Sequence, residues 1–200
     1  MACRSLDKAN AAKAQIEAGG ITGSISTVQL DVTDDESIQK AAAFVEQQFG
    51  RLDVLINNAA WGVAKFFRPL LLKATSPPSS KAYSIYVTSG LGSLADTADT
   101  PPYPMTTPDF EPYAACKAAL NMYMLLDWRE SQATDIKVFA MCPGFVVSNL
   151  MGSEETARTG GALDPRKPGK LVLSIVEGER DEDEWANVKF KIVLFRRCQR

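Results

Sequence analysis

Residues 25–57 read ISTVQLDVTDDESIQKAAAFVEQQFGRLDVLIN, and this stretch decides the fold class. Its two ends are typical of β-strands. Ile25 to Val32 is rich in β-branched side chains, and Leu52 to Asn57 (LDVLIN) is a short apolar run suited to a strand buried on both faces. The segment between them has the periodicity of an amphipathic helix. A strand, a helix and a second strand in succession predict an α/β protein with a parallel sheet.

The helix in the middle of this stretch has start and stop signals of its own. Thr33 or Asp34 can act as its N-cap, and Gly50 follows Phe49, its last expected residue. The residues that share its apolar face are Ile38, Ala41, Ala42, Val45 and Phe49. We therefore expect this helix to pack one side against the sheet.

The alternation of helices and strands continues on both sides of this stretch. Further helices are predicted over Ser5 to Ala18, Val63 to Lys73 and Tyr113 to about Ser131, and further strands over Tyr83 to Ser89, Lys137 to Met141 and Leu171 to Val176. The proline-rich segment Asp96 to Pro112 predicts a surface loop. Together these elements indicate an α/β fold with a doubly wound, mostly parallel sheet.

Bulk composition excludes several classes of function. The chain has 200 residues, of which 46% are hydrophobic, and its formal net charge is −2. These values suit a single globular domain and give no electrostatic reason to expect nucleic acid or an anionic membrane as partner. The sequence contains neither an apolar run of about 18 residues nor the pattern of a secretory leader. We therefore expect a cytoplasmic protein that does not span a membrane.

The chain contains no histidine and four widely spaced cysteines. A Ser-His-Asp triad, a Cys-His dyad and histidine metal ligands are thereby excluded, so acid–base chemistry must come from Tyr, Lys, Cys or carboxylates. The cysteines show no C-x-x-C spacing, so we expect neither a metal site nor a disulfide framework. An α/β hydrolase would need G-x-S-x-G and a histidine, and the sequence has neither.

Tyr113 and Lys117 are the strongest candidates for chemistry. They lie four positions apart on a predicted helix, so their side chains share a face. A free phenol has a pKa of about 10, and a neighbouring ammonium lowers that pKa. Such a phenol can give a proton to a developing alkoxide, or take one in the reverse direction. Because Tyr and Lys at this spacing are common on helices, the pair alone also fits an ordinary helix surface.

Other polar residues follow the ends of predicted strands. In a parallel sheet, ligands bind beyond the carboxyl ends of the strands. Asn57 and Ser89 lie at such places, and the Pro143-Gly144 turn follows the next strand. Each of them has an ordinary explanation as a turn or cap residue. Their common position nevertheless predicts one site at the carboxyl edge of the sheet.

In this order, the motifs resemble the classical short-chain dehydrogenase/reductase family. The landmarks are LDVTD with Asp31, NNAA with Asn57, Ser89, Tyr113-x-x-x-Lys117 and Pro143-Gly144. The passages VTSGLGS and EPYAACKAALNMY are similar to carbonyl-reductase-like members. The resemblance implies a Rossmann-like NAD(P)-binding domain over residues 1–185. Residues 186–200 are expected to be a divergent tail, with a membrane or partner strip as the alternative.

The resemblance also implies the chemistry of the site. Tyr113 would be the general acid or base, Lys117 would lower its pKa and bind the nicotinamide ribose, and Ser89 would hold the substrate oxygen. Hydride transfer would reduce a ketone or aldehyde, or oxidise the alcohol. The implied partner is a small carbonyl or alcohol substrate.

The cofactor contacts follow from the same resemblance. Asp31 would bind the adenine, Asn57 would lie beside the cofactor, and Val146 and Ser148 would contact the nicotinamide amide. Arg4 stands where NADP-preferring members place a cation, and a guanidinium binds a 2′-phosphate bidentately. We therefore expect NADP rather than NAD, with an ordinary solvated arginine as the alternative.

A glycine motif after a predicted strand resembles a phosphate-binding site. Residues 90–95 read GLGSLA and match G-x-G-x-x-A after a strand. That fingerprint requires a helix immediately afterwards, so that the helix N-terminus meets the pyrophosphate. Because a proline-rich segment follows here, we expect these residues not to bind phosphate.

The sequence departs from the family pattern in three places. The family's first strand and TGxxxGIG turn would precede Arg4, so we expect weak cofactor binding and unpaired edges on the strands that end at Asp31 and Asn57. The segment between Ala60 and Phe66 is too short for the family's proton-relay Asn, and it shortens a helix of the usual homo-oligomer interface. The third departure is the tail. These departures suggest a degraded or wrongly delimited gene product. The alternative to an enzyme is therefore an inactive remnant of the family that acts as a binding or regulatory protein.

Overall fold

The computed structural model describes residues 1–59, 62–76, 80–99, 110–183 and 193–194. The strands are β1 (Ala2–Cys3), β2 (Val28–Gln29), β3 (Val54–Asn57), β4 (Ala82–Val87), β5 (Ile136–Cys142) and β6 (Val193–Leu194). The helices are α1 (Leu6–Ala18), α2 (Asp35–Phe49), α3 (Val63–Ala74), α4 (Leu94–Asp99), α5 (Glu111–Ser131), α6 (Glu154–Thr159) and α7 (Arg166–Val176), and Gly90–Gly92 forms a 3₁₀ turn, η1. Most of the proline-rich loop and most of the expected tail lie outside the described residues.

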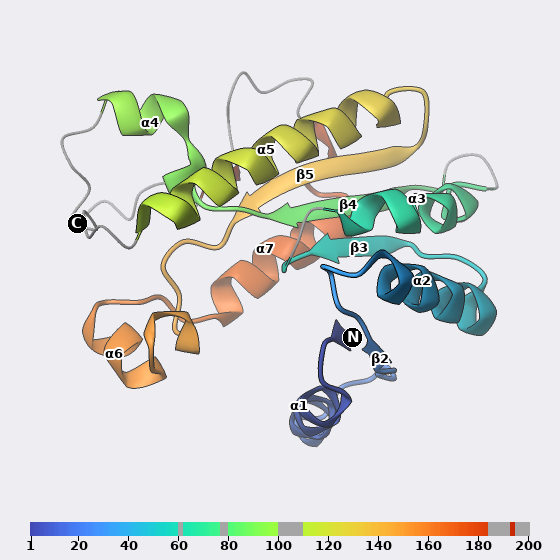
Figure 1. Ribbon diagram of the computed structural model, residues 1–200, viewed down its shortest axis with the longest axis horizontal. Coiled ribbons are helices and arrows are strands. Elements are labelled where there is room, and N and C mark those ends of the chain that lie inside the picture. Colours follow the sequence, from blue (N-terminus) through green and yellow to red (C-terminus); the bar gives the residue numbers. More distant parts are fainter. Residues whose placement is uncertain (60–61, 77–79, 100–109, 184–192, 195–200) are drawn as a thin grey trace.

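The strands form two parallel sheets (Figure 1). One sheet has the order β3-β4-β5-β6, and the other pairs β1 with β2. In the larger sheet Asn57 lies opposite Tyr86, so β3 and β4 end close together. The expected unpaired edge is present on β3, which ends the larger sheet and pairs only with β4, whereas the strand before Asp31 pairs with β1 at Val28–Gln29.

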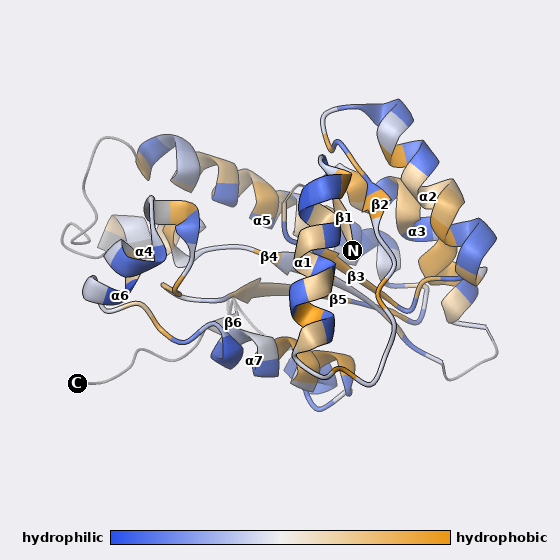
Figure 2. Ribbon diagram, turned by 90° about the horizontal axis from the view of Figure 1, so that it is seen from below, coloured by the Kyte–Doolittle hydropathy of each residue, from blue (hydrophilic) through white to orange (hydrophobic). Residues whose placement is uncertain are grey.

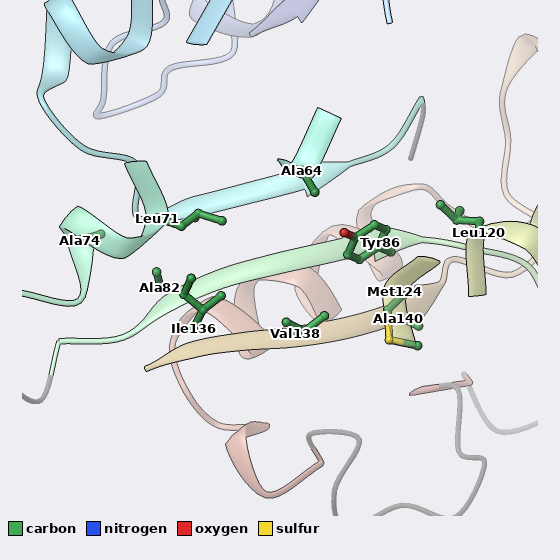
Figure 3. Close-up of a cluster of buried hydrophobic side chains, with 10 residues drawn as sticks. All are labelled: Ala64, Leu71, Ala74, Ala82, Tyr86, Leu120, Met124, Ile136, Val138 and Ala140. Atoms are coloured by element: carbon green, nitrogen blue, oxygen red, sulfur yellow. The ribbon is translucent and has the colours of Figure 1, made fainter. Parts of the chain in front are cut away.

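Helices cover both faces of the larger sheet, which confirms the doubly wound α/β architecture (Figures 1 and 2). The cluster between this sheet and α3 and α5 consists of Ala64, Leu71, Ala74, Ala82, Tyr86, Leu120, Met124, Ile136, Val138 and Ala140 (Figure 3). On the other face, Leu171 and Ile175 of α7 pack against Ile85 and Phe139 of the sheet. Removing this apolar surface from water on both faces is the main stabilising term of the fold.

Helix α2 forms as its sequence predicts. The Asp34 side chain accepts a 3.0 Å hydrogen bond from the Glu36 N–H, and Gly50 ends the helix in the left-handed conformation with φ 74°. Ile38 is buried in the cluster that joins α2 to α3. Phe49, which we expected on the apolar face, is exposed at the end of the helix.

The predicted strand over Leu171–Val176 is wrong, because these residues form the second half of α7. Pro168, Leu171 and Ile175 are buried, whereas Leu173 is 53% exposed. Burial at a spacing of three to four residues is the pattern of a helix that lies on a sheet. The apolar run LVLSIV hid this period because it is equally apolar on every side.

The lengths and surroundings of other strands also differ from the prediction. β3 is an edge strand and Ile56 is 47% exposed, so it is not buried on both faces. The strand expected over Ile25–Val32 is paired only at Val28–Gln29, because its neighbour β1 is equally short.

The segment Asp96–Pro112 is not wholly a loop, since α4 extends to Asp99 and α5 begins at Glu111. A helix does follow the GLGSLA motif, so our reason for excluding it was wrong.

A partly buried ion pair joins α3 to α5. Arg68 donates through Nη1 to Asp127 Oδ1 and to Ser131 Oγ, at 2.9 Å each, and through Nη2 to a main-chain oxygen of α5. The other Asp127 carboxylate oxygen accepts hydrogen bonds from Ser84 and Tyr86 of β4, at 2.9 and 2.8 Å. Asp127 therefore holds α5, the helix of Tyr113 and Lys117, to both the sheet and α3.

Candidate active site

Tyr113 and Lys117 lie in the first turns of α5. The start of this helix lies beside the end of β4 (Figure 1). Lys117 Nζ lies 5.6 Å from the centroid of the Tyr113 ring, and both side chains are half-buried. The same Nζ donates a 2.8 Å hydrogen bond to the main-chain oxygen of Val87 in β4. The structure thus brings the two residues together as their spacing predicts, with the ammonium against the ring face and the end of β4.

Ser89 meets this pair from the end of β4. Its hydroxyl lies close enough to the Tyr113 phenol to lower the pKa of that phenol. The Leu91 N–H donates to Ser89 Oγ at 3.2 Å as the chain turns into η1. The bond from Leu91 uses a lone pair of Ser89 Oγ. It leaves the hydroxyl proton of Ser89 available to the phenol oxygen. Ser89, Tyr113 and Lys117 therefore form one cluster.

The pKa of Tyr113 does not move in the direction expected from its lysine neighbour. Burial raises the pKa of Tyr113, the Ser89 hydroxyl opposes that rise, and the electrostatic effect of Cys142 adds to it. Burial also lowers the pKa of Lys117, because it disfavours the charged ammonium. The net shift in the pKa of Tyr113 is thus upward, and the lowering by Lys117 stays a prediction.

Gly92 allows η1 to lie directly on α5. A Cβ atom at Gly92 would stand 2.6 Å from the Lys117 carbonyl carbon and 2.8 Å from the Ala118 nitrogen. These are main-chain atoms of a helix and have no room to move aside. The glycine of the GLGSLA motif therefore serves close packing beside Lys117.

Replacing Gly92 with alanine is expected to destabilise the protein by about 2 kcal/mol, because the added methyl group overpacks the contact with α5. The midpoint of urea unfolding measures this change. The matched control is Gly169→Ala in α7, where nothing lies within 4 Å of the added atom and alanine favours the helix. Equal midpoints for the two variants would contradict the packing argument.

Arg4 and Asp31 lie together at the end of the smaller sheet. Arg4 is exposed, and its main-chain oxygen accepts a hydrogen bond from Gln29 Nε2 at 3.3 Å. Asp31 Oδ1 accepts from the N–H and the hydroxyl of Thr33, at 3.0 and 2.7 Å. These two bonds lower the pKa of Asp31, and the Arg4 charge lowers it a little further. The site therefore offers a guanidinium and a carboxylate close to each other.

Asn57 is turned away from the carboxyl edge. Its side chain is 4% exposed and donates to Ser84 Oγ at 3.4 Å. Its Oδ1 is buried and has no hydrogen-bond partner among the residues that the structure describes. A ligand beside β3 would therefore meet the exposed turn at Asn58 and Ala59 rather than the Asn57 amide.

Val146 and Ser148 lie in the segment that follows β5. Val146 pairs with Leu163, through bonds made by the residues on either side of Val146. In this ladder the N–H and C=O of Val146 itself point to the opposite side, where a ligand amide can meet them. Ser148 caps the next turn, its hydroxyl accepting from the Leu150 N–H at 3.4 Å.

Two residues near this cluster were not predicted from the sequence. Asn121 continues the spacing of Tyr113 and Lys117 by one more helical turn, and that spacing was a signal that could have found it. Cys142, at the buried end of β5, is close enough to influence the pKa of both Tyr113 and Lys117. No local sequence signal places Cys142 there, because β5 and α5 meet only in the tertiary structure.

Comparison with known proteins identifies the family. A family profile described as short chain dehydrogenase matches residues 1–76. The short-chain dehydrogenase/reductase tropE of Talaromyces stipitatus is 34% identical over 197 residues, covering 80% of this chain and 71% of the relative. The short-chain dehydrogenase/reductase eupG of a Phoma species is 32% identical over 211 residues, covering 82% and 74%. The chain belongs to the short-chain dehydrogenase/reductase family, as its motifs predicted.

Solved structures agree with this assignment. A short chain dehydrogenase from Salmonella enterica serovar Typhi has a TM-score of 0.68 at 16% identity and covers 90% of this chain and 79% of its own. An NADPH-bound carbonyl reductase from chicken fatty liver has a TM-score of 0.63 at 27% identity, covering 76% and 67%. The Rossmann-like fold class is thereby confirmed. Across the described ranges, none of the helices has the length and apolarity needed to cross a bilayer.

Proposed function

We propose that the protein is an NADP-dependent reductase that converts a ketone or aldehyde into an alcohol. The observation that carries the proposal is the cluster of Ser89, Tyr113 and Lys117 at the carboxyl end of a parallel sheet. A bound nicotinamide cofactor would supply the hydride. The residues of the chain then have to orient the carbonyl oxygen and give it a proton.

The state of the Tyr113 phenol supports the reductive direction. Reduction leaves an alkoxide oxygen that needs a proton, and a protonated phenol can give one. A free phenol already keeps its proton at neutral pH, and burial raises the pKa of Tyr113 further. The Ser89 hydroxyl, which lowers the pKa of the same phenol, would bind the carbonyl oxygen. Oxidation would need the phenolate, which this environment disfavours.

The remaining polar groups suit a nicotinamide dinucleotide by their chemistry. Lys117 offers an ammonium for ribose hydroxyls, and Val146 offers its main-chain N–H and C=O for a carboxamide. Arg4 offers an exposed guanidinium for a 2′-phosphate, with Asp31 and Ser148 as further polar contacts. The likeness to an NADPH-bound carbonyl reductase supports the same cofactor.

Fluorescence titration of the full chain with NADPH tests the proposal, followed by absorbance assays of NADPH oxidation with a panel of ketones and aldehydes. We expect saturable binding and turnover of at least one carbonyl compound. Absence of binding up to millimolar NADPH would overturn the proposal. That result would favour the alternative, an inactive family member that acts as a binding or regulatory protein.

Replacing Arg4 with serine is expected to weaken NADPH binding by about tenfold and to leave NADH binding unchanged. The reason is that a guanidinium makes charge-assisted hydrogen bonds with the 2′-phosphate, which NADH lacks. Dissociation constants for the two cofactors measure the effect. Lys8→Ser, which removes an exposed positive charge from α1, is the matched control. Equal weakening of NADPH and NADH binding in Arg4→Ser would contradict this assignment.

A further inference from the structure

Side chains on one face of α5 bind the segment from Val87 to Gly92, which contains Ser89. Tyr113, Lys117 and Asn121 follow one another at intervals of four residues, so they lie on the same face of the helix. The Tyr113 phenol lies close enough to Ser89 for the serine to lower its pKa, and Lys117 Nζ is hydrogen-bonded to the main-chain oxygen of Val87. Asn121 is the third residue on this face, and the proposed chemistry has no role for it.

The Asn121 amide is bonded at both of its ends. Its Oδ1 accepts a 2.5 Å hydrogen bond from the hydroxyl of Thr88, a side chain that is almost completely buried. Its Nδ2 donates to the main-chain oxygen of Gly92 at 3.2 Å. Because the Gly92 carbonyl can only accept, the amide nitrogen has to face it, and the amide oxygen then faces the Thr88 hydroxyl, which donates to it.

The two partners of Asn121 enclose Ser89. Thr88 directly precedes the serine, and its own N–H donates to the Met141 oxygen of β5 at 2.8 Å. Gly92 follows three residues later, and its N–H donates to the Ser89 main-chain oxygen at 3.0 Å. A group that ties Thr88 and Gly92 to α5 therefore also fixes the place of Ser89 relative to Tyr113.

We propose that Asn121 is a positioning residue, which bridges Thr88 and Gly92 and so holds the Ser89 hydroxyl against the Tyr113 phenol. Its importance for catalysis rests on the proposed function, but the bridge itself does not. Asn121 contacts neither the phenol nor the serine hydroxyl in the bonds described above. Its effect on the reaction is therefore indirect.

The bridge is tested by titrating a fluorinated tyrosine placed at position 113 of the full chain. Its phenol ionises near neutral pH, so ¹⁹F NMR can follow the titration without unfolding the protein. Ser89→Ala removes the hydroxyl that lowers the phenol pKa, so it should raise that pKa by about one unit. If Asn121 holds Ser89 in place, Asn121→Leu and Thr88→Val should each produce most of the same rise.

Thr88→Ser is the matched control, because it keeps the hydroxyl that Asn121 accepts, and it should leave the pKa where it is. The double variant Ser89→Ala/Asn121→Leu should show no larger rise than Ser89→Ala alone, since both changes break the same contact. An unchanged pKa in Asn121→Leu, or a rise that adds to that of Ser89→Ala, would overturn the proposal.

The kinetic readout separates this proposal from the proposed function. In an active enzyme, Asn121→Leu should lower kcat about tenfold and leave the KM for NADPH unchanged, because the cofactor contacts stay in place. A lower kcat without a rise in the phenol pKa would overturn the positioning role and leave the reductase proposal intact. A chain that reduces no carbonyl compound would refute the reductase proposal, and the titration would still decide whether the bridge exists.

Discussion

Replacing Tyr113 with phenylalanine is expected to lower the rate of NADPH-dependent carbonyl reduction by about 10³-fold, the usual contribution of a general acid. The change removes only the phenol oxygen, whose pKa Ser89 influences and which would give the alkoxide its proton in the proposed reaction. Water would then have to supply the proton. Because the affected step is chemical, kcat should fall while the dissociation constant for NADPH stays within about twofold. Absorbance assays and fluorescence titration measure the two quantities.

The matched control for this variant is Tyr123→Phe. Tyr123 lies on the same helix, is partly exposed, and is separated from Tyr113 by almost three helical turns. The same chemical change there should leave kcat unchanged. Substantial reduction by Tyr113→Phe, or an equal loss in Tyr123→Phe, would remove the basis for assigning the proton transfer to Tyr113.

The fold class could be predicted because local signals and tertiary packing agree over most of the chain. In α2 the cap at Asp34, the apolar face with Ile38 and the stop at Gly50 all specify the same helix that the structure contains. The error at Leu171–Val176 has the opposite cause. Its run of apolar side chains suits a strand and a helix equally, and only contact with Ile85 and Phe139 selects the helix.

The candidate site was predictable where local sequence determines it and not where contacts between distant segments determine it. The spacing of Tyr113 and Lys117 is a local property, so the sequence was enough to place them on one face. The pKa of Tyr113 depends on burial by residues from other elements, and the spacing carries no information about that burial. Asn121 was missed for a similar reason, because its partners Thr88 and Gly92 lie 33 and 29 residues away in the chain.

Replacing Arg68 with methionine is expected to destabilise the protein by about 3 kcal/mol, a large fraction of the stability of an ordinary domain. Arg68 and Asp127 are only 18% and 13% exposed, so the change leaves a carboxylate largely removed from water without its counter-charge. Methionine keeps most of the apolar length of the arginine side chain, so the lost volume is small. The midpoint of urea unfolding measures the loss.

A second substitution separates the effect of charge from the effect of packing. Asp127→Asn keeps an oxygen that can accept from Ser84 and Tyr86 but removes the negative charge. If the uncompensated charge is what destabilises Arg68→Met, the double variant Arg68→Met/Asp127→Asn should be more stable than Arg68→Met alone, although it carries one more change. A double variant that is less stable than Arg68→Met would attribute the loss to packing and hydrogen bonds. The surface pair Lys40–Glu36, whose side chains are 74% and 72% exposed, provides the control, and Lys40→Met should leave the midpoint unchanged.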